Sequence, residues 1–140
     1  MLKGIHRFIS PELLKALMEM GHGDEIVLGD SNFPSASHAQ HLVRSDGHRI
    51  PDLLGAILPL FPLDYAVGHA AVLMGCNGNP QPSVWNRYRE ILNAYPEGDK
   101  PFSVISKIEF YQQAKSAYCI VATGESETFA NIILRKGVIK

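Results

Sequence analysis

Short apolar runs of the kind found in β-strands alternate with helical stripes along this chain of 140 residues, and this alternation limits the fold more than any other feature. The runs at residues 26–28 and 70–74 are short, and each is followed by glycine, as is usual for buried strands. The segments between such runs carry apolar residues three and four positions apart, the spacing of a helix face. This pattern predicts a single α/β domain over residues 1–140 with a largely buried sheet.

The first helix has signals at both of its ends. Ser10 can cap it, Pro11 suits its first position, and Gly21 is expected to end it in the left-handed conformation. We expect further helices over residues 51–58, 84–95 and 108–117, and strands over residues 26–28, 41–44, 70–74, 102–105, 118–122 and 131–134. His22 then lies in a tight loop before the first strand, and Asp30 lies just after that strand.

The composition of the chain limits the kinds of partner that it is expected to bind. Hydrophobic residues make up 46% of the chain, enough for a globular core, and the formal net charge of -1 gives no basic field for nucleic acid or an anionic membrane. No apolar run is long enough to cross a bilayer, and the first residues do not resemble a signal peptide. Cys76 and Cys119 are far apart and are expected to be free thiols, so a cytoplasmic location is expected.

The segment Gly21-His22-Gly23 is the first candidate for a reactive group. Two glycines leave the imidazole uncrowded, and histidine can both give and take a proton near neutral pH. Asp30 sits at a strand end, where α/β sheets commonly bind ligands, and its carboxylate could accept hydrogen bonds from hydroxyls or orient the histidine. A helix-ending glycine followed by a solvated loop histidine remains the alternative.

Two further groups of residues are candidates for binding. Asn131 ends a polar loop and offers a donor and an acceptor to neighbouring hydroxyls, although it could equally be a turn or capping residue. His38, His41 and His69 could supply a metal-dependent hydrolase, but their spacing matches no zinc motif.

The sequence resembles the RbsD/FucU family of L-fucose mutarotases and D-ribose pyranases along essentially its whole length. The resemblance is closer to the fucose mutarotase branch because of the long match at residues 9–15. The motifs that carry it are Ile9-Ser10-Pro11-Glu12-Leu13-Leu14-Lys15, Gly21-His22-Gly23-Asp24-Glu25, Asp30, Phe33-Pro34, Pro59-Leu60-Phe61, Phe110-Tyr111, Thr123-Gly124-Glu125, Asn131-Ile132 and Lys136-Gly137-Val138.

The resemblance implies a fold and an assembly. The family fold is a three-layer α/β/α arrangement with a mixed sheet, and its members form ring-like homo-oligomers, commonly decamers, with sugar sites near subunit contacts. It also implies roles for particular residues. His22 matches the proton-transferring histidine and Asp30 a sugar-binding aspartate.

Lys107 replaces the arginine of the fucose branch, keeping the positive charge but losing the planar fork. Phe129, Ala130 and Asn131 fall where the family reads Tyr, then Gly or Ala, then Asn, so only the tyrosine hydroxyl is missing.

The implied reaction is opening of a sugar ring and closure on the other face, by a base at the anomeric hydroxyl and an acid at the ring oxygen. It involves no redox change, activated leaving group or metal, so no cofactor is expected. The chain is therefore expected to be a monosaccharide mutarotase, an isomerase acting on L-fucose or a related sugar. The alternatives are ribose-type pyranose–furanose exchange and a non-catalytic monosaccharide-binding protein.

Overall fold

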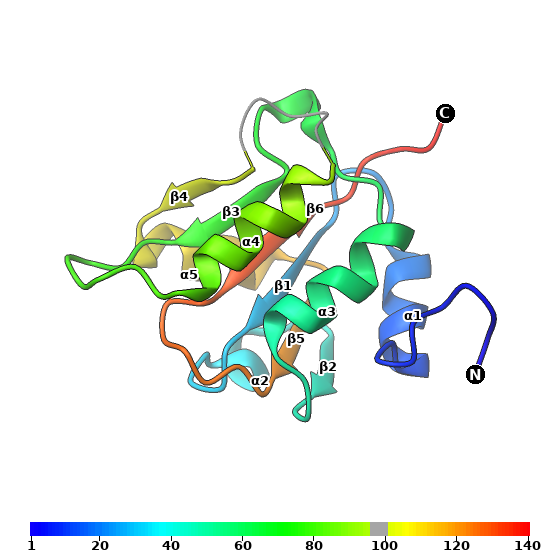
Figure 1. Ribbon diagram of the computed structural model, residues 1–140, viewed down its shortest axis with the longest axis horizontal. Helices are drawn as coiled ribbons and strands as arrows, with labels where there is room; N and C mark the ends of the chain where they lie inside the picture. Colours follow the sequence, from blue (N-terminus) through cyan, green and yellow to red (C-terminus); the bar gives the residue numbers. More distant parts are fainter. Residues whose placement is uncertain (96–100) are drawn as a thin grey trace.

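A computed structural model describes residues 1–95 and 101–140, and it has a six-stranded sheet at its centre (Figure 1). The strands are β1 (Glu25–Gly29), β2 (Leu42–Ser45), β3 (Ala71–Met74), β4 (Ser103–Ile105), β5 (Cys119–Thr123) and β6 (Ile132–Arg135). Their order across the sheet is β2-β5-β1-β6-β3-β4. β6 runs antiparallel to both of its neighbours, β1 and β3, and the other paired strands run parallel. The sheet is therefore mixed.

Helices cover both faces of the sheet. They are α1 (Pro11–Glu19), α2 (Ser35–His38), α3 (Ile50–Ile57), α4 (Val84–Asn93) and α5 (Lys107–Ser116), with short 3-10 turns at Leu58–Leu60 and Tyr65–Val67. Alternate residues of β1 show the two faces: Ile26 and Leu28 pack with α1, α3 and α4, and Val27 packs with Phe110 of α5. Because strand side chains alternate between faces, the sheet has an apolar core on each side. The predicted three-layer α/β/α fold is confirmed.

The sheet has two ends that matter for the site. At the carboxyl edge, β1 to β5 end and β6 begins; at the amino edge, β1 to β5 begin and β6 ends. Open α/β sheets usually bind ligands beyond the carboxyl ends of their parallel strands. The carboxyl edge is therefore the first place to look for a site.

The strands and the four longer helices were expected from the sequence to within a few residues. The end of α1 was predicted incorrectly. Met20 ends the helix in an extended conformation, and the left-handed residue of the following loop is Gly23, with φ 86°, not Gly21. The ammonium group of Lys136 donates to the carbonyls of Leu17 and Met20, so a side chain from the far end of the sequence satisfies the last carbonyl groups of this helix.

None of the helices in the described ranges is long and apolar enough to cross a membrane.

Candidate functional site

Asp30 lies directly after β1 at the carboxyl edge and is almost fully buried, with 4% exposure. Its backbone N–H donates to Oδ1 of Asn131 over 2.7 Å, and its own Oδ1 accepts the N–H of Asn32 over 3.0 Å. The first bond joins the end of β1 to the start of β6, where the chain enters the sheet. Asp30 and Asn131, separated by 101 positions, are therefore one structural unit.

The pKa of Asp30 is raised above its ordinary value. Burial is the main cause, and the nearby carboxylate of Glu125 adds to it, while the backbone N–H groups of Asn32, Ala130 and Phe33 act in the opposite direction. A carboxyl group held in this way can accept hydrogen bonds from hydroxyls and is more readily protonated than an exposed one.

A cavity of about 340 Å³ opens beside Asp30, a volume typical of small-molecule sites. Phe33, Ser35 and Thr123 are among the residues that line it. An ion pair between Arg44 and Asp46 lies at the same cavity, with Nη2 and Oδ1 separated by 2.6 Å. Polar groups thus surround the carboxylate at this edge.

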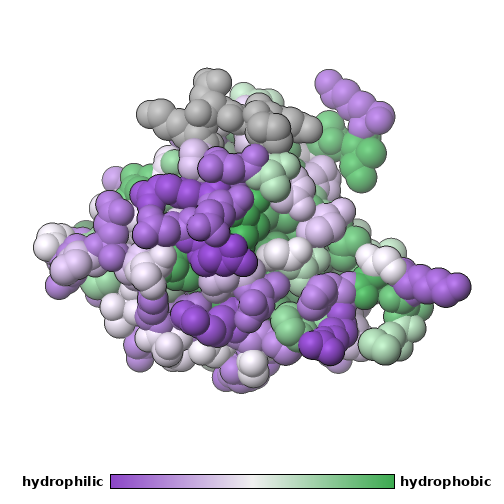
Figure 2. All heavy atoms as spheres, viewed as in Figure 1, coloured by the Kyte–Doolittle hydropathy of each residue, from purple (hydrophilic) through white to green (hydrophobic). Residues whose placement is uncertain are grey.

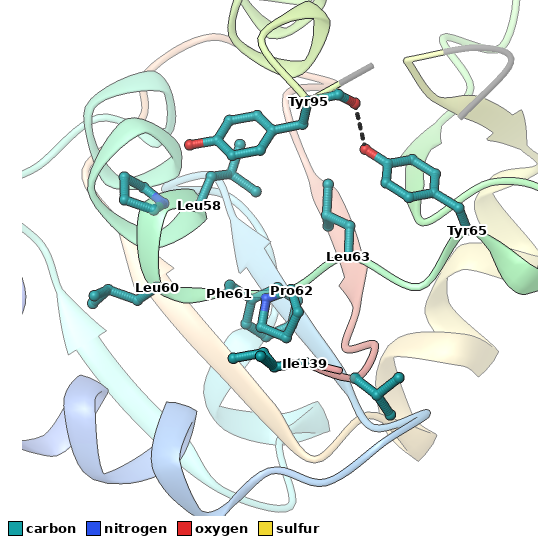
Figure 3. A pocket seen from close by; sticks show the side chains of 10 residues that line it. Leu58, Leu60, Phe61, Pro62, Leu63, Tyr65, Tyr95 and Ile139 are labelled. Atoms are coloured by element: carbon teal, nitrogen blue, oxygen red, sulfur yellow. Dashed lines mark hydrogen bonds between the residues drawn. The ribbon is translucent and has the colours of Figure 1, made fainter. Parts of the chain in front are cut away.

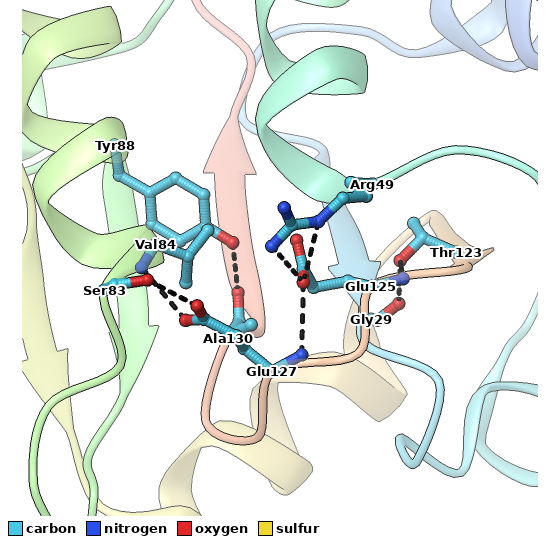
Figure 4. A network of polar contacts seen from close by, with 9 residues as sticks. All are labelled: Gly29, Arg49, Ser83, Val84, Tyr88, Thr123, Glu125, Glu127 and Ala130. Atoms are coloured by element: carbon cyan, nitrogen blue, oxygen red, sulfur yellow. Dashed lines mark hydrogen bonds and ion pairs between the residues drawn. The ribbon is translucent and has the colours of Figure 1, made fainter.

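Two acidic residues, the buried Glu125 and the partly buried Glu127, hold the loop that precedes β6 (Figure 4). Glu125 is fully buried, and its Oε2 accepts from Nη2 of Arg49 over 3.0 Å and from the N–H of Glu127 over 3.1 Å. The carboxylate of Glu127 accepts the hydroxyl of Ser83 and the N–H of Val84, and so caps the start of α4. The loop therefore has a defined shape although it has no regular secondary structure.

Phe129 occupies this loop in a conformation that aromatic residues rarely adopt, with φ 57°. This left-handed backbone conformation costs on the order of 1–3 kcal/mol of free energy and persists only where surrounding contacts hold the residue in place. The indole N–H of Trp85 donates to the Phe129 carbonyl over 2.9 Å, and the Tyr88 hydroxyl donates to the Ala130 carbonyl over 2.6 Å. Two aromatic residues of α4 thus fix the backbone at the position that the family resemblance marks as sugar-binding.

Lys107 also lies at the carboxyl edge, as the first residue of α5 directly after β4. It is exposed, and its ammonium group is 5.5 Å from the centre of the Tyr111 ring. Tyr111 in turn packs edge-on against Phe33, with the ring centres 5.4 Å apart. A cation and two aromatic rings therefore border the region around Asp30.

His22 lies at the amino edge, before β1. Its loop is fixed by the N–H of Gly21, which donates to Asp24 over 2.7 Å, and by the N–H of Gly23, which donates to the Lys136 carbonyl over 2.8 Å. The imidazole is 59% exposed, as the flanking glycines predicted, and its Nε2 lies 3.3 Å from Oδ2 of Asp64. An exposed imidazole beside a buried carboxylate is a plausible proton-transfer group.

The structure separates His22 from the other predicted site residues. Asp30, Lys107, Phe129, Ala130 and Asn131 gather at the carboxyl edge, and the five residues of β1 stand between them and His22, roughly 16 Å of extended chain. The expectation that Asp30 could orient His22 within the chain is wrong, because Asp64 is the carboxylate beside the imidazole. Asp64 was not expected from the sequence, since the bridge between Leu63 and Lys136 and the Asp64 N–H bond to the Arg135 carbonyl bring it to this edge.

The structure also bears on the expected roles of Ala130 and of the three histidines considered as metal ligands. The side chain of Ala130 is fully buried in the core, so only its backbone can contribute to a binding site. Among the described residues, no group of three or more His, Cys, Asp or Glu side chains could hold a metal ion. His38 packs against Tyr111 at one place and His41 against Tyr118 at another, so the proposed hydrolase ligands do not converge.

The three layers and the polar groups at the carboxyl edge define a small α/β protein with a site suited to a hydroxyl-rich ligand. The chain belongs to the RbsD / FucU transport protein family, which matches residues 3–139. It is 44% identical to the fucose mutarotase of Mus musculus, over 99% of this chain and 95% of that protein. The predicted family is confirmed.

Solved structures agree with this assignment. The crystal structure of the fucose mutarotase from Streptococcus pneumoniae in complex with L-fucose has a TM-score of 0.95 and 49% identity, over 99% of this chain and 100% of that one. Bacillus subtilis RbsD complexed with D-ribose has a TM-score of 0.80 over 100% of both chains, but at 19% identity it shows only a shared fold. The closer resemblance to the fucose branch, expected from the sequence, is also confirmed.

Proposed function

We propose that this protein is a mutarotase that interconverts the anomers of L-fucose or a closely related monosaccharide. The observation that carries the proposal is the full-length similarity, at a TM-score of 0.95 and 49% identity, to a fucose mutarotase with L-fucose bound. The chain has a histidine on an exposed glycine loop and a buried aspartate beside a cavity, the residues to which the family resemblance assigns proton transfer and sugar binding.

The chemistry needs only positioned acid–base groups. A base takes the proton of the anomeric hydroxyl while an acid gives a proton to the ring oxygen, and the bond between that oxygen and the anomeric carbon breaks. The aldehyde then rotates, the same hydroxyl oxygen adds to its other face, and both protons return. His22 is the proton-transferring group in this proposal, and Asp30 holds sugar hydroxyls. Asn131 uses its amide oxygen to accept the Asp30 N–H, so its amide NH₂ group is the part left to donate to a sugar oxygen.

The separation of His22 from Asp30 supports a site made by two chains. A single sugar ring cannot span roughly 16 Å of strand, so His22 of one copy would meet the carboxyl edge of another. The proposal therefore extends to a homo-oligomer, and specifically to the decamer that the family resemblance implies.

An apolar groove that includes Leu63, the neighbour of Asp64 in the chain, suits such a contact. It has a volume of about 360 Å³, and Phe61, Pro62 and Ile139 also line it (Figure 3). Ile139 is 85% exposed, and apolar residues gather on the side of the molecule where both termini lie (Figure 2). Exposed apolar surface of this kind commonly marks a protein interface, and a second copy is the occupant that would also complete the site.

The two cysteines are free, which fits the reducing cytoplasm as the proposed location.

Saturation-transfer NMR on a panel of reducing sugars tests the function directly. Exchange between the anomers of L-fucose faster than the spontaneous rate is the expected result. Acceleration of pyranose–furanose exchange of D-ribose instead would favour the pyranase alternative. Sugar binding without acceleration of exchange for any sugar would contradict the mutarotase function and favour a non-catalytic monosaccharide-binding protein.

Replacing Phe129 with tyrosine is expected to raise exchange of fucose by about tenfold, or about 1.4 kcal/mol of transition-state stabilisation. The phenylalanine ring is held at the carboxyl edge but lacks the hydroxyl found at this position in the family. Tyr111 lies at the same edge of the chain as Phe129, whereas the Tyr118 hydroxyl lies at the amino edge and is already bonded to Glu19. The same NMR assay on fucose and ribose measures the effect. No gain on either sugar would mean that the missing hydroxyl does not limit the rate.

A further inference from the structure

Ser35 is a buried serine at the carboxyl edge whose hydroxyl the fold does not use. It begins α2, is 4% exposed and lines the cavity of about 340 Å³ beside Asp30. Its backbone N–H donates to the Phe33 carbonyl over 2.7 Å, and its carbonyl accepts the Ala39 N–H over 2.9 Å. Its Oγ, in contrast, has no hydrogen-bond partner among the described residues. The backbone of Ser35 is therefore satisfied, and its side chain is not.

A buried hydroxyl without a partner makes the folded protein less stable. The group has lost its hydrogen bonds to water, and folded proteins leave few buried polar side chains in this state. Alanine, which differs from serine only by the absence of Oγ, would fill the same place without this loss. The hydroxyl at position 35 therefore needs another reason, and a ligand in the adjoining cavity supplies one.

Of the described residues that line this cavity, Thr123 carries the other buried hydroxyl, and that group is fully engaged (Figure 4). Its Oγ1 donates to the Gly29 carbonyl over 2.7 Å and accepts the Glu125 N–H over 3.2 Å. Thr123 could serve a ligand only by breaking a bond that joins β5 to β1. Ser35 can do so without breaking any hydrogen bond of its side chain.

The turn after β1 fixes Ser35 beside Asp30. The N–H of Phe33 donates to the Asp30 carbonyl over 3.0 Å and closes the turn. The Phe33 ring lies against the backbone of Gly29, where a Cβ atom would be only 2.8 Å from the ring. The side chain of serine has three staggered positions, so its Oγ can turn toward a ligand while this backbone stays in place.

We propose that Ser35 is a sugar-binding residue whose hydroxyl donates to one non-reacting hydroxyl oxygen, at carbon 2, 3 or 4, of the monosaccharide held by Asp30. An ionised Asp30 can only accept hydrogen bonds, and Ser35 supplies a donor beside it. A site built to bond a particular hydroxyl rejects analogues that lack it, so Ser35 contributes to the choice of sugar. This inference rests on the proposed function, because it takes the ligand at this edge to be a sugar.

The first test is Ser35→Ala, which removes only Oγ. In the free protein the substitution removes an unpaired buried hydroxyl, so we expect the midpoint of thermal unfolding to rise by about 2–4 °C. In the complex it removes a hydrogen bond, so we expect calorimetry to show an affinity for L-fucose that is about 3- to 10-fold weaker. A hydroxyl that only held the loop together would lower the midpoint instead.

Ser116→Ala is the matched control. It is the same substitution at an exposed position in the last turn of α5, away from the carboxyl edge. It should leave both the thermal midpoint and the affinity for L-fucose unchanged.

The second test identifies the sugar oxygen that Ser35 contacts. The 2-deoxy, 3-deoxy and 4-deoxy forms of L-fucose are titrated into the wild type and into Ser35→Ala. We expect one of them to bind both proteins with the same affinity, because the missing oxygen and the missing hydroxyl belong to one hydrogen bond. The other two should still bind Ser35→Ala about 3- to 10-fold more weakly than the wild type.

Failure of this inference and failure of the proposed function can be told apart. If the wild type accelerates exchange of L-fucose while Ser35→Ala keeps full affinity or has a lower midpoint, the function stands and the role of Ser35 is wrong. An equal loss of affinity on Ser35→Ala for all three deoxy sugars would also overturn that role. If the wild type binds L-fucose without accelerating exchange, the mutarotase function fails, and the same titrations still decide Ser35. No binding of L-fucose to the wild type would overturn both.

Discussion

Replacing His22 with alanine is expected to reduce anomer exchange by about 10²–10⁴-fold, the usual contribution of a positioned acid–base group. The fold and the oligomer should persist, because the side chain is 59% exposed and belongs to neither apolar core. Sugar affinity should change little, since the groups proposed to bind hydroxyls lie at the carboxyl edge of another copy. Saturation-transfer NMR gives the rate, calorimetry gives the affinity, and circular dichroism reports the fold.

His41→Ala is the matched control, because His41 is also exposed at the amino edge and packs on Tyr118 away from Asp64. It should retain the wild-type exchange rate. Loss of folding in His22→Ala would instead assign His22 a structural role, and retained exchange would remove it from the mechanism.

Replacing Asp30 with asparagine is expected to weaken sugar binding by roughly 1.5–3 kcal/mol, the value of a hydrogen bond to a charged group. Asparagine keeps an oxygen for the Asn32 N–H, so the loop after β1 should be preserved while the charge is lost. Calorimetric titration with the sugar that exchanges fastest measures the change. Asp52→Asn removes a negative charge from an exposed position in α3 outside this cavity and should leave the affinity unchanged. Equal losses of sugar affinity in both variants would mean that the overall negative charge, and not a hydrogen bond to Asp30, determines the affinity.

Local signals in the sequence predicted most of the fold. The Ser10-Pro11 start of α1 is such a case, because the Ser10 hydroxyl accepts the Leu13 N–H as a cap should. The short helix α2 was not expected, since its four residues are too few to show a helical period. The end of α1 was misplaced because Lys136, distant in sequence, supplies the partner for its last carbonyls.

The candidate site was predicted as a set of residues but not as an arrangement. The strand predicted between His22 and Asp30 is present, and it places the two residues at opposite edges of the sheet, so Asp30 cannot orient His22 within one chain. Asp64 gave no local signal, since it follows an apolar loop and comes beside His22 through the bridge between Leu63 and Lys136, which are distant in sequence. Trp85 is buried in the core, and its hydrogen bond to the Phe129 carbonyl depends on a loop whose path the sequence does not reveal.

Co-expression of His22→Ala and Asp30→Asn chains tests the central claim, a mutarotase site shared between two copies, most directly. Each variant alone should be slow at low sugar concentration. If His22 and Asp30 come from different chains, random mixing at equal amounts leaves roughly a quarter of the sites with both residues intact.

We therefore predict that purified mixed oligomers exchange fucose at roughly a quarter of the wild-type rate, well above either variant alone. Exchange no greater than the average of the two separate variants would contradict the shared site.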